Sequence, residues 1–213
     1  MAINAAAGPH GATFAAGRAE ELAQKYGLNT VCSLFQLRHD VFHGRLRWIP
    51  ASPNGLDVDE FDALAPTHGL VMHQGVVVGG WRLLPTIGPY MLADIFPDVL
   101  RGNPPPKAAT IWEVSRFSLN TLLGSAVALS AAASLLQGLF HTAYTLGADQ
   151  LIACSDVRFQ RLLERAGMRL SLYGPPVRMA DGVEAVAGVA DVASHLHRAI
   201  GAKWSTLNEG IAA

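Results

Sequence analysis

Cysteine is scarce in this sequence: Cys32 and Cys154 are the only two, and neither belongs to a CxxC pair or has a histidine at zinc-ligand spacing. They cannot form a disulfide framework, so we expect two reduced, largely buried thiols. The eight histidines contain no HExxH motif. We therefore expect no metal site.

An excess of charge of either sign is also lacking. Sixteen Lys and Arg residues oppose 17 Asp and Glu residues, which gives a formal net charge of -1. No global field attracts nucleic acid or an acidic membrane surface, so we expect neither partner. The apolar stretch of residues 126–136 is interrupted by Ser130 and Ser134 and is too short to span a bilayer. No basic segment precedes an apolar one at the start, so we expect a cytoplasmic protein.

Motifs for covalent or dinucleotide chemistry are missing as well. The sequence has no GxSxG nucleophile motif and no GxGxxG after an early strand, which argues against a serine hydrolase and a Rossmann-type methyltransferase. Half of the residues are hydrophobic, which is ample for one substantial core. We predict a single domain over residues 19–213 after a flexible segment, residues 1–18, that is rich in small residues.

The hydrophobic periodicity predicts an ordered series of elements. Helices are expected over residues 19–27 and 30–44, followed by an irregular loop over 49–66. A β-hairpin turning at Gln74-Gly75 and a strand over 110–120 come next. The rest is a long helix over 125–146, a strand over 149–156, a cationic helix over 157–167, a strand over 168–176, and a strand or short helix before a terminal helix. This order predicts an α/β fold in which helices cover a mixed, mostly antiparallel sheet, as in N-acetyltransferase-like proteins.

Four short segments contain the candidate catalytic and binding residues. They are LRHDVFHGRLRW, GLDVDEFD, GGWRLLPT and IWEVSRF. In this order and spacing they resemble the autoinducer (acyl-homoserine lactone) synthase family, and the resemblance extends from about Leu37 through the helix that contains residues 161–167. It implies an enzyme that transfers an acyl group from a thioester to the amine of S-adenosylmethionine, closes a lactone and releases methylthioadenosine as it makes a quorum-sensing signal. S-adenosylmethionine is then a substrate, and no cofactor is expected.

The resemblance assigns the S-adenosylmethionine site to Arg38, Phe42 and Trp48. Aromatic faces suit a sulfonium beside an adenine ring, because cation–π contacts contribute roughly 0.5–2 kcal/mol each. Taken singly, the two aromatic residues would be read as core residues and Arg38 as a surface charge.

The same resemblance implies an ionic cluster of Asp59 and Asp62 with Arg82 and Arg116. A buried arginine needs an acidic partner, so a network is expected rather than isolated pairs. Asp57 stands where the family usually has glutamate. Without the resemblance, the acidic loop would be a solvated turn and Arg82 an edge-strand charge facing water.

Glu113 is the candidate catalytic base, because acylation needs a neutral amine and the α-ammonium group of S-adenosylmethionine must lose a proton. On a regular strand Glu113 and Arg116 would face opposite sides, unless a bulge intervenes. A strand glutamate paired with a cross-strand lysine or arginine is the alternative.

The acyl donor has two predicted contact regions. Arg158, Arg161 and Arg165 lie on the cationic helix, and by resemblance such a basic surface receives an acyl carrier protein, while the same charges could meet coenzyme A phosphates. Residues of the long helix, including Leu135, Leu139 and Thr142 near its end, are expected to wall an acyl pocket, although most of its apolar residues must belong to the core.

Two other functions fit the predicted fold. An N-acyltransferase acting on another amine is one, although the Q/RxxGxG/A loop of such enzymes is absent before the long helix. A non-catalytic ligand-binding domain is the other, and it would not need Glu113.

Overall fold

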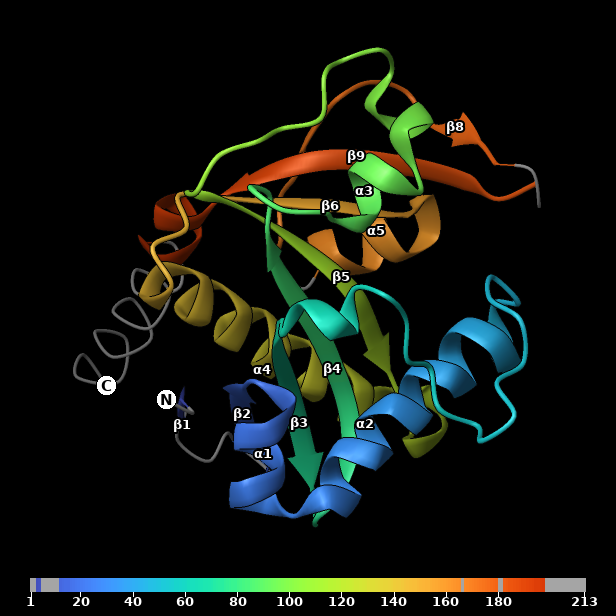
Figure 1. The fold of residues 1–213 in the computed structure, drawn as a ribbon, viewed down its shortest axis with the longest axis vertical. Coiled ribbons are helices and arrows are strands. Elements are labelled where there is room, and N and C mark those ends of the chain that lie inside the picture. Colours follow the sequence, from blue (N-terminus) through green and yellow to red (C-terminus); the bar gives the residue numbers. More distant parts are fainter. Residues whose placement is uncertain (1–2, 5–11, 166, 180–181, 198–213) are drawn as a thin grey trace, which may run out of the picture.

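The computed structural model describes residues 3–4, 12–165, 167–179 and 182–197. Their strands form one nine-stranded sheet in the order β1-β2-β3-β4-β5-β6-β9-β7, with β8 paired to β9 (Figure 1). β5 and β6 pair in parallel, whereas the other pairs are antiparallel. The strands are β1 Ile3–Asn4, β2 Ala12–Gly17, β3 Thr67–His73, β4 Val76–Pro85, β5 Ile111–Leu119, β6 Gln150–Asp156, β7 Ser171–Leu172, β8 Val177–Arg178 and β9 Glu184–Asp191.

Helices cover both faces of this sheet. On one face lie α1 (Ala19–Tyr26), α2 (Leu28–His39) and α3 (Met91–Asp94), and on the other α4 (Ser125–Thr145) and α5 (Val157–Arg165) (Figure 1). α2 continues directly into a π-helix, Asp40–Arg45, and three 3-10 turns lie at Asp62–Leu64, Pro97–Leu100 and Thr121–Leu123. The predicted layered α/β architecture is confirmed.

The hairpin between β3 and β4 turns at the predicted place. Gln74 and Gly75 both have positive φ, 51° and 79°. Two consecutive residues with positive φ form a hairpin turn whose twist matches that of the paired strands, and glycine adopts a positive φ without steric cost.

One side of the long helix α4 packs against the sheet, and its other side faces solvent. It is long and apolar enough, by length and composition, to cross a membrane, but half of its most apolar window is buried inside the protein. It packs on β2, β3, β4 and β5 at close range: a Cβ at Gly138 would lie 2.3 Å from the ring of Phe14. Core packing therefore accounts for the apolar character of this helix.

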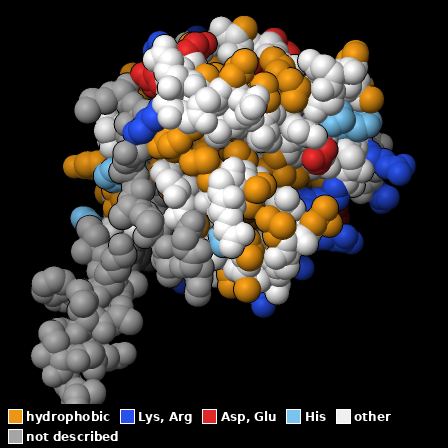
Figure 2. Space-filling view, turned by 90° about the horizontal axis from the view of Figure 1, so that it is seen from below, with side chains coloured by type: hydrophobic (Ala, Val, Ile, Leu, Met, Phe, Trp, Pro, Cys, Tyr) orange, Lys and Arg blue, Asp and Glu red, His pale blue; other side chains and the backbone are white. Residues whose placement is uncertain are grey.

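On the face shown in Figure 2, acidic and basic side chains are scattered among other side chains, and neither sign of charge covers the surface.

Two expectations differ from the structure. Residues 12–17 belong to the segment expected to be flexible, yet they form β2, which pairs with both β1 and β3. Their alanines and Phe14 are buried, so packing rather than β propensity fixes this strand. The strand expected over 168–176 is limited to Ser171–Leu172.

The pairing of β5 opens the sheet near its middle. β5 pairs with β6 only from Ile111 to Val114, after which the two parallel strands diverge. Its register with β4 shifts between Gly80 and Arg82, and Arg116 has a φ of 53°. A positive φ at a non-glycine residue beside a register shift is the geometry of a β-bulge, which bends a strand and redirects its side chains. The bulge therefore both opens the sheet and turns Arg116.

Candidate active site

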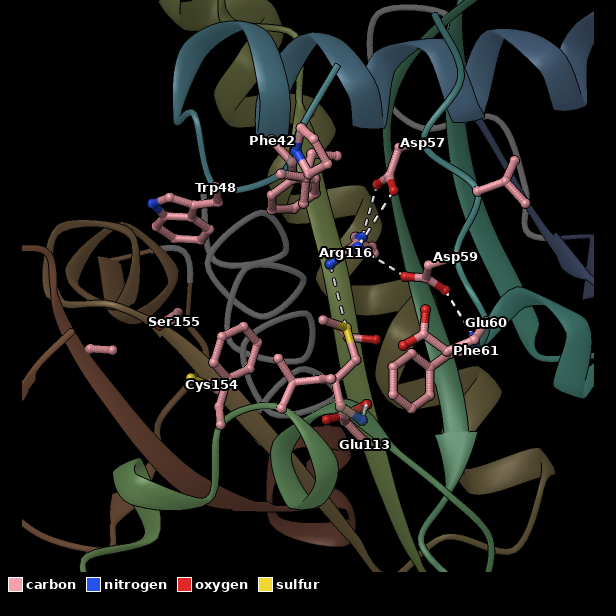
Figure 3. A pocket seen from close by; sticks show the side chains of 18 of the residues that line it. Phe42, Trp48, Asp57, Asp59, Glu60, Phe61, Glu113, Arg116, Cys154 and Ser155 are labelled. Atoms are coloured by element: carbon pink, nitrogen blue, oxygen red, sulfur yellow. Dashed lines mark hydrogen bonds and ion pairs between the residues drawn. The ribbon is translucent and has the colours of Figure 1, made fainter. Parts of the chain in front are cut away.

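A cleft of about 690 Å³ lies where β5 and β6 diverge. Its walls come from the π-helix, the loop after it, α3, both diverging strands and the chain around β9 (Figure 3). Six of the residues singled out from the sequence line it: Phe42, Trp48, Asp57, Asp59, Glu113 and Arg116. Segments more than 60 positions apart in the chain thus share one cavity.

The aromatic wall is shaped by the π-helix. The carbonyl oxygen of Phe42 accepts hydrogen bonds from the backbone N–H groups of Trp48, at 2.7 Å, and Ile49, at 3.4 Å. This closure brings the rings of Phe42 and Trp48 to 6.1 Å, with 34° between their planes. π-Helical turns are rare and are common at functional sites. Both rings line the cleft, as the S-adenosylmethionine assignment requires.

Beside this wall, three arginines and three aspartates form one ionic cluster. Arg38 donates to both carboxylate oxygens of Asp62, at 2.9 Å each. Its Nε reaches Asp57 at 3.1 Å, and the Nε of Arg116 binds the same Asp57 oxygen at 2.8 Å. Asp57 therefore joins two arginines, and the predicted network exists with this further member.

The remaining contacts close the cluster around Arg82. Its guanidinium contacts Asp59 and lies 3.1 Å from Asp62, and its Nε donates to Ser115 Oγ at 3.2 Å. Arg116 Nη2 lies 2.8 Å from Asp59. Burial would raise the pKa of Asp62, but the hydrogen bonds and charge of Arg38, with the charge of Arg82, hold that pKa well below its usual range. The cluster thus pairs three guanidinium groups with three carboxylates.

Exposure divides the cluster into a buried part and a part facing the cleft. The side chains of Arg38 and Arg82 are 1% and 0% exposed, and neither lines the cavity. Arg116, which is 9% exposed, lines it and lies 5.1 Å from the centre of the Phe42 ring. Arg38, which the resemblance assigns to the S-adenosylmethionine site, does not line the cleft and instead binds Asp57 and Asp62 behind its wall.

Glu113 is buried, and its carboxylate is held by the backbone at the start of α3. It accepts hydrogen bonds from the N–H groups of Met91, at 3.1 Å, and Leu92, at 2.6 Å. Burial raises the pKa of Glu113, against the opposing effect of these amides and of the charges of Arg82 and Arg116. Its hydrogen bonds are therefore not those of a strand glutamate paired with a cross-strand lysine or arginine.

Because of the bulge in β5, Glu113 and Arg116 lie on the same side of the strand and not on opposite sides. Both Glu113 and Arg116 line the cleft, and both contact Met91, Glu113 through the backbone amide and Arg116 through the sulfur at 3.4 Å. Three carboxylates line the cleft outside the arginine–aspartate pairs: Glu60 is exposed, Asp156 is half-buried, and Glu113 is buried. A raised pKa and the lack of an arginine of its own suit a proton acceptor.

The three residues expected to wall an acyl pocket on α4 do not line this cleft. Leu135, Leu139 and Thr142 are each 0% exposed, on the side of α4 that packs against the sheet, and none lines the cleft. Leu135 and Leu139 belong to the main hydrophobic core. By contrast, Arg158, Arg161 and Arg165 are exposed on α5, as a docking surface requires.

Several site residues were not assigned from the sequence. Asp57 was noted without a role, although its spacing of two from Asp59 is a signal that both carboxylates could share a face. Met91 could not have been found, because it acts through its backbone N–H and sulfur. Cys154 lines the cleft, where burial and the charge of Glu113 raise its pKa to about 12, so it is a neutral thiol. Among the described residues, no group of His, Cys, Asp and Glu could hold a metal.

The fold and the site together define an acyltransferase-like class. The chain resembles a putative N-acetyltransferase from Lactobacillus plantarum in fold alone, with 17% identity and a TM-score of 0.53 over 85% of this chain and 98% of that one. Residues 24–200 match the model of the autoinducer synthase family. The protein belongs to this family.

Individual relatives agree with that membership. The chain is 36% identical over 162 residues to an acyl-homoserine-lactone synthase of Acinetobacter nosocomialis, covering 73% of this chain and 88% of the relative. It resembles the crystal structure of the AHL synthase LasI, with 31% identity, a TM-score of 0.73, and 85% and 90% of the two chains covered. It also resembles the CoA-dependent acyl-homoserine lactone synthase BjaI, solved with SAM and isopentyl-CoA, with 25% identity, a TM-score of 0.73, and 87% and 88% covered.

Proposed function

We propose that this protein is an acyl-homoserine lactone synthase that acylates S-adenosylmethionine and releases methylthioadenosine. One observation carries the proposal: a single cleft joins an aromatic wall, an arginine–aspartate cluster and the buried carboxylate of Glu113, which is not paired with an arginine. Each part meets a requirement of the reaction, and family membership supports the assignment.

S-adenosylmethionine would bind against the aromatic and acidic walls. Phe42 and Trp48 offer faces for the adenine ring and the sulfonium charge. Asp57 and Asp59 line the same cleft, and their carboxylates attract the sulfonium and the α-ammonium group. Arg116 is the cation placed to receive the methionine carboxylate, since it is the arginine of the cluster that lines the cavity.

Acylation begins when Glu113 accepts a proton from the α-ammonium group, directly or through water. The freed nitrogen lone pair attacks the thioester carbonyl carbon, a C–N bond forms, and the C–S bond breaks as the thiol leaves with a proton. The methionine carboxylate then attacks its own γ-carbon. The C–O bond closes the lactone, the bond between γ-carbon and sulfur breaks, and sulfur keeps that electron pair in neutral methylthioadenosine.

No step of this reaction needs an enzyme nucleophile or a resident cofactor. The thiol in the cleft, Cys154, is neutral because of its raised pKa, so it is a poor nucleophile. S-adenosylmethionine is consumed as a substrate. We assign the reaction to the cytoplasm, where both this substrate and acyl thioesters are made.

The acyl donor is an acyl carrier protein or acyl-coenzyme A. Arg158, Arg161 and Arg165 are exposed on α5, which follows the diverging strand β6 directly, so a phosphate-bearing donor could meet them at one side of the cleft. Replacing Arg161 and Arg165 by glutamate should raise KM for a carrier-protein donor at least tenfold, because attraction becomes repulsion. An unchanged KM for both kinds of donor would remove this surface from the proposal.

The proposal is tested by offering the purified protein S-adenosylmethionine with a panel of acyl carrier protein and coenzyme A thioesters. Mass spectrometry should detect methylthioadenosine and an acyl lactone with at least one donor. An acylated product without methylthioadenosine would indicate an N-acyltransferase for another amine. No turnover, with S-adenosylmethionine bound, would indicate a ligand-binding domain.

A further inference from the structure

The loop that carries Trp48 forms a long stretch of the cleft wall. Trp48, Ile49, Pro50, Ala51 and Ser52 all line the cavity. Trp48 and Ile49 pack on a hydrophobic cluster, whereas Pro50 and Ala51 are exposed, so side-chain burial does little to hold the later part of this stretch. The exposed part of the wall therefore depends more on hydrogen bonds to the neighbouring helix for its position.

Two histidines supply such bonds on either side of the exposed pair. His43 Nδ1 lies 3.1 Å from the carbonyl oxygen of Ile49, and His39 Nε2 lies 3.3 Å from the backbone nitrogen of Ser52. A carbonyl oxygen only accepts and a backbone N–H only donates, so His43 donates while His39 accepts. Both rings therefore carry a proton on Nδ1, and the Nε2 of His39 must be unprotonated.

The helix geometry brings the two rings together. His39 ends α2 and His43 lies in the π-helix that continues it, and their ring centroids are 4.8 Å apart with 30° between the planes. This pair of adjacent rings thus reaches both ends of the Ile49–Ser52 stretch. The same π-helix gives the Phe42 carbonyl that binds the amide of Trp48.

We propose that His39 and His43 are positioning residues for S-adenosylmethionine: they hold the Ile49–Ser52 wall, and through it Trp48, against the bound ligand. This inference rests on the proposed function. Neither histidine lines the cleft, so each acts through the loop and not on the reacting atoms. Losing the bonds should weaken ligand binding and leave the chemical step unchanged.

Isothermal titration of the full-length protein with S-adenosylmethionine tests the inference. His39→Leu and His43→Leu should each raise Kd about fivefold, because a hydrogen bond contributes on the order of 1 kcal/mol. kcat at saturating substrates should change by less than about twofold. His39→Gln and His43→Asn should restore Kd, since their amides can accept and donate at the same points. His141→Leu, at an exposed histidine on α4, is the matched control and should behave as the parent.

A ligand-free readout separates this inference from the proposed function. Trypsin should cleave after Arg45 and Arg47 faster in the leucine variants than in the parent or the amide variants, because the adjoining loop is released. Failure of the parent to bind S-adenosylmethionine would refute the proposed function. The trypsin result would still test whether the two histidines hold the Ile49–Ser52 wall. Unchanged Kd and cleavage in the leucine variants, or equal effects in leucine and amide variants, would overturn the role of the histidines.

Discussion

Replacing Asp57 by asparagine removes one negative charge from the ionic cluster while keeping the size of the side chain. Asp57 is 4% exposed and joins the Nε atoms of Arg38 and Arg116, at 3.1 and 2.8 Å. The variant leaves three arginines facing two aspartates. Both stability and the titration of Glu113 should respond, in directions that the structure fixes.

The expected stability loss is about 3 kcal/mol, since breaking a buried ion pair by removing one partner costs roughly 3–5 kcal/mol and asparagine keeps one acceptor oxygen. The uncompensated positive charge also favours the charged form of Glu113. The pKa of Glu113, which burial raises in the parent, should therefore fall.

Urea denaturation measures the stability loss, and the pH dependence of kcat measures the titration. A catalytic base must be unprotonated, so activity declines on the acid side, and this acid limb should move to lower pH in Asp57→Asn. Asp98→Asn, at an exposed acid on the Pro97–Leu100 turn, is the matched control and should change neither quantity. An acid limb that stays in place or moves to higher pH would refute the electrostatic balance around Glu113.

Four further outcomes follow from the same geometry. Glu113→Gln should lower kcat at least about 100-fold while Kd for S-adenosylmethionine changes less than about threefold, by stopped-flow kinetics and titration; an equal rate would remove it as the base. Trp48→Leu should raise that Kd about tenfold, through lost cation–π and stacking contacts; an unchanged value contradicts the aromatic wall. The lowered pKa of Asp62 contributes stability that is complete above its unfolded value of 3.8 and is lost as pH falls below it; acid denaturation of Asp62→Asn should show a smaller dependence over that range. Gly80→Ala should lower the thermal midpoint, because a Cβ would lie 2.3 Å from Leu34 Cδ1; an unchanged midpoint would contradict this close packing.

Much of the fold followed from local pattern. The hairpin at Gln74-Gly75 and the alternation of strand, long helix and strand after residue 110 depend on turn chemistry and periodicity, which are properties of neighbouring residues. The strand Ala12–Gly17 was not predicted because its alanines have little β propensity, and it forms through burial of its side chains and pairing with β1 and β3.

The sequence predicted which residues form the site better than it predicted how their side chains are arranged. The motifs predicted an ionic cluster of Asp59, Asp62, Arg82 and Arg116, and these side chains are in contact in the structure. The bulge at Arg116 could not be derived, because a positive φ at arginine is imposed by the surrounding structure and not by local preference.

Two placements depended on packing and were therefore beyond the sequence. Arg38 is enclosed behind the wall because Asp57 and Asp62 both satisfy it. Leu135 and Leu139 on α4 are buried in the core, and their burial depends on how closely the helix approaches the sheet.

The most direct test of the central claim, that one cleft both acylates S-adenosylmethionine and closes the lactone, is a single-turnover reaction with substrate labelled by ¹⁵N at the amine and ¹³C at the carboxylate. The account predicts a lactone that carries both labels, with one methylthioadenosine released per lactone. Methylthioadenosine formed without a doubly labelled lactone would contradict it.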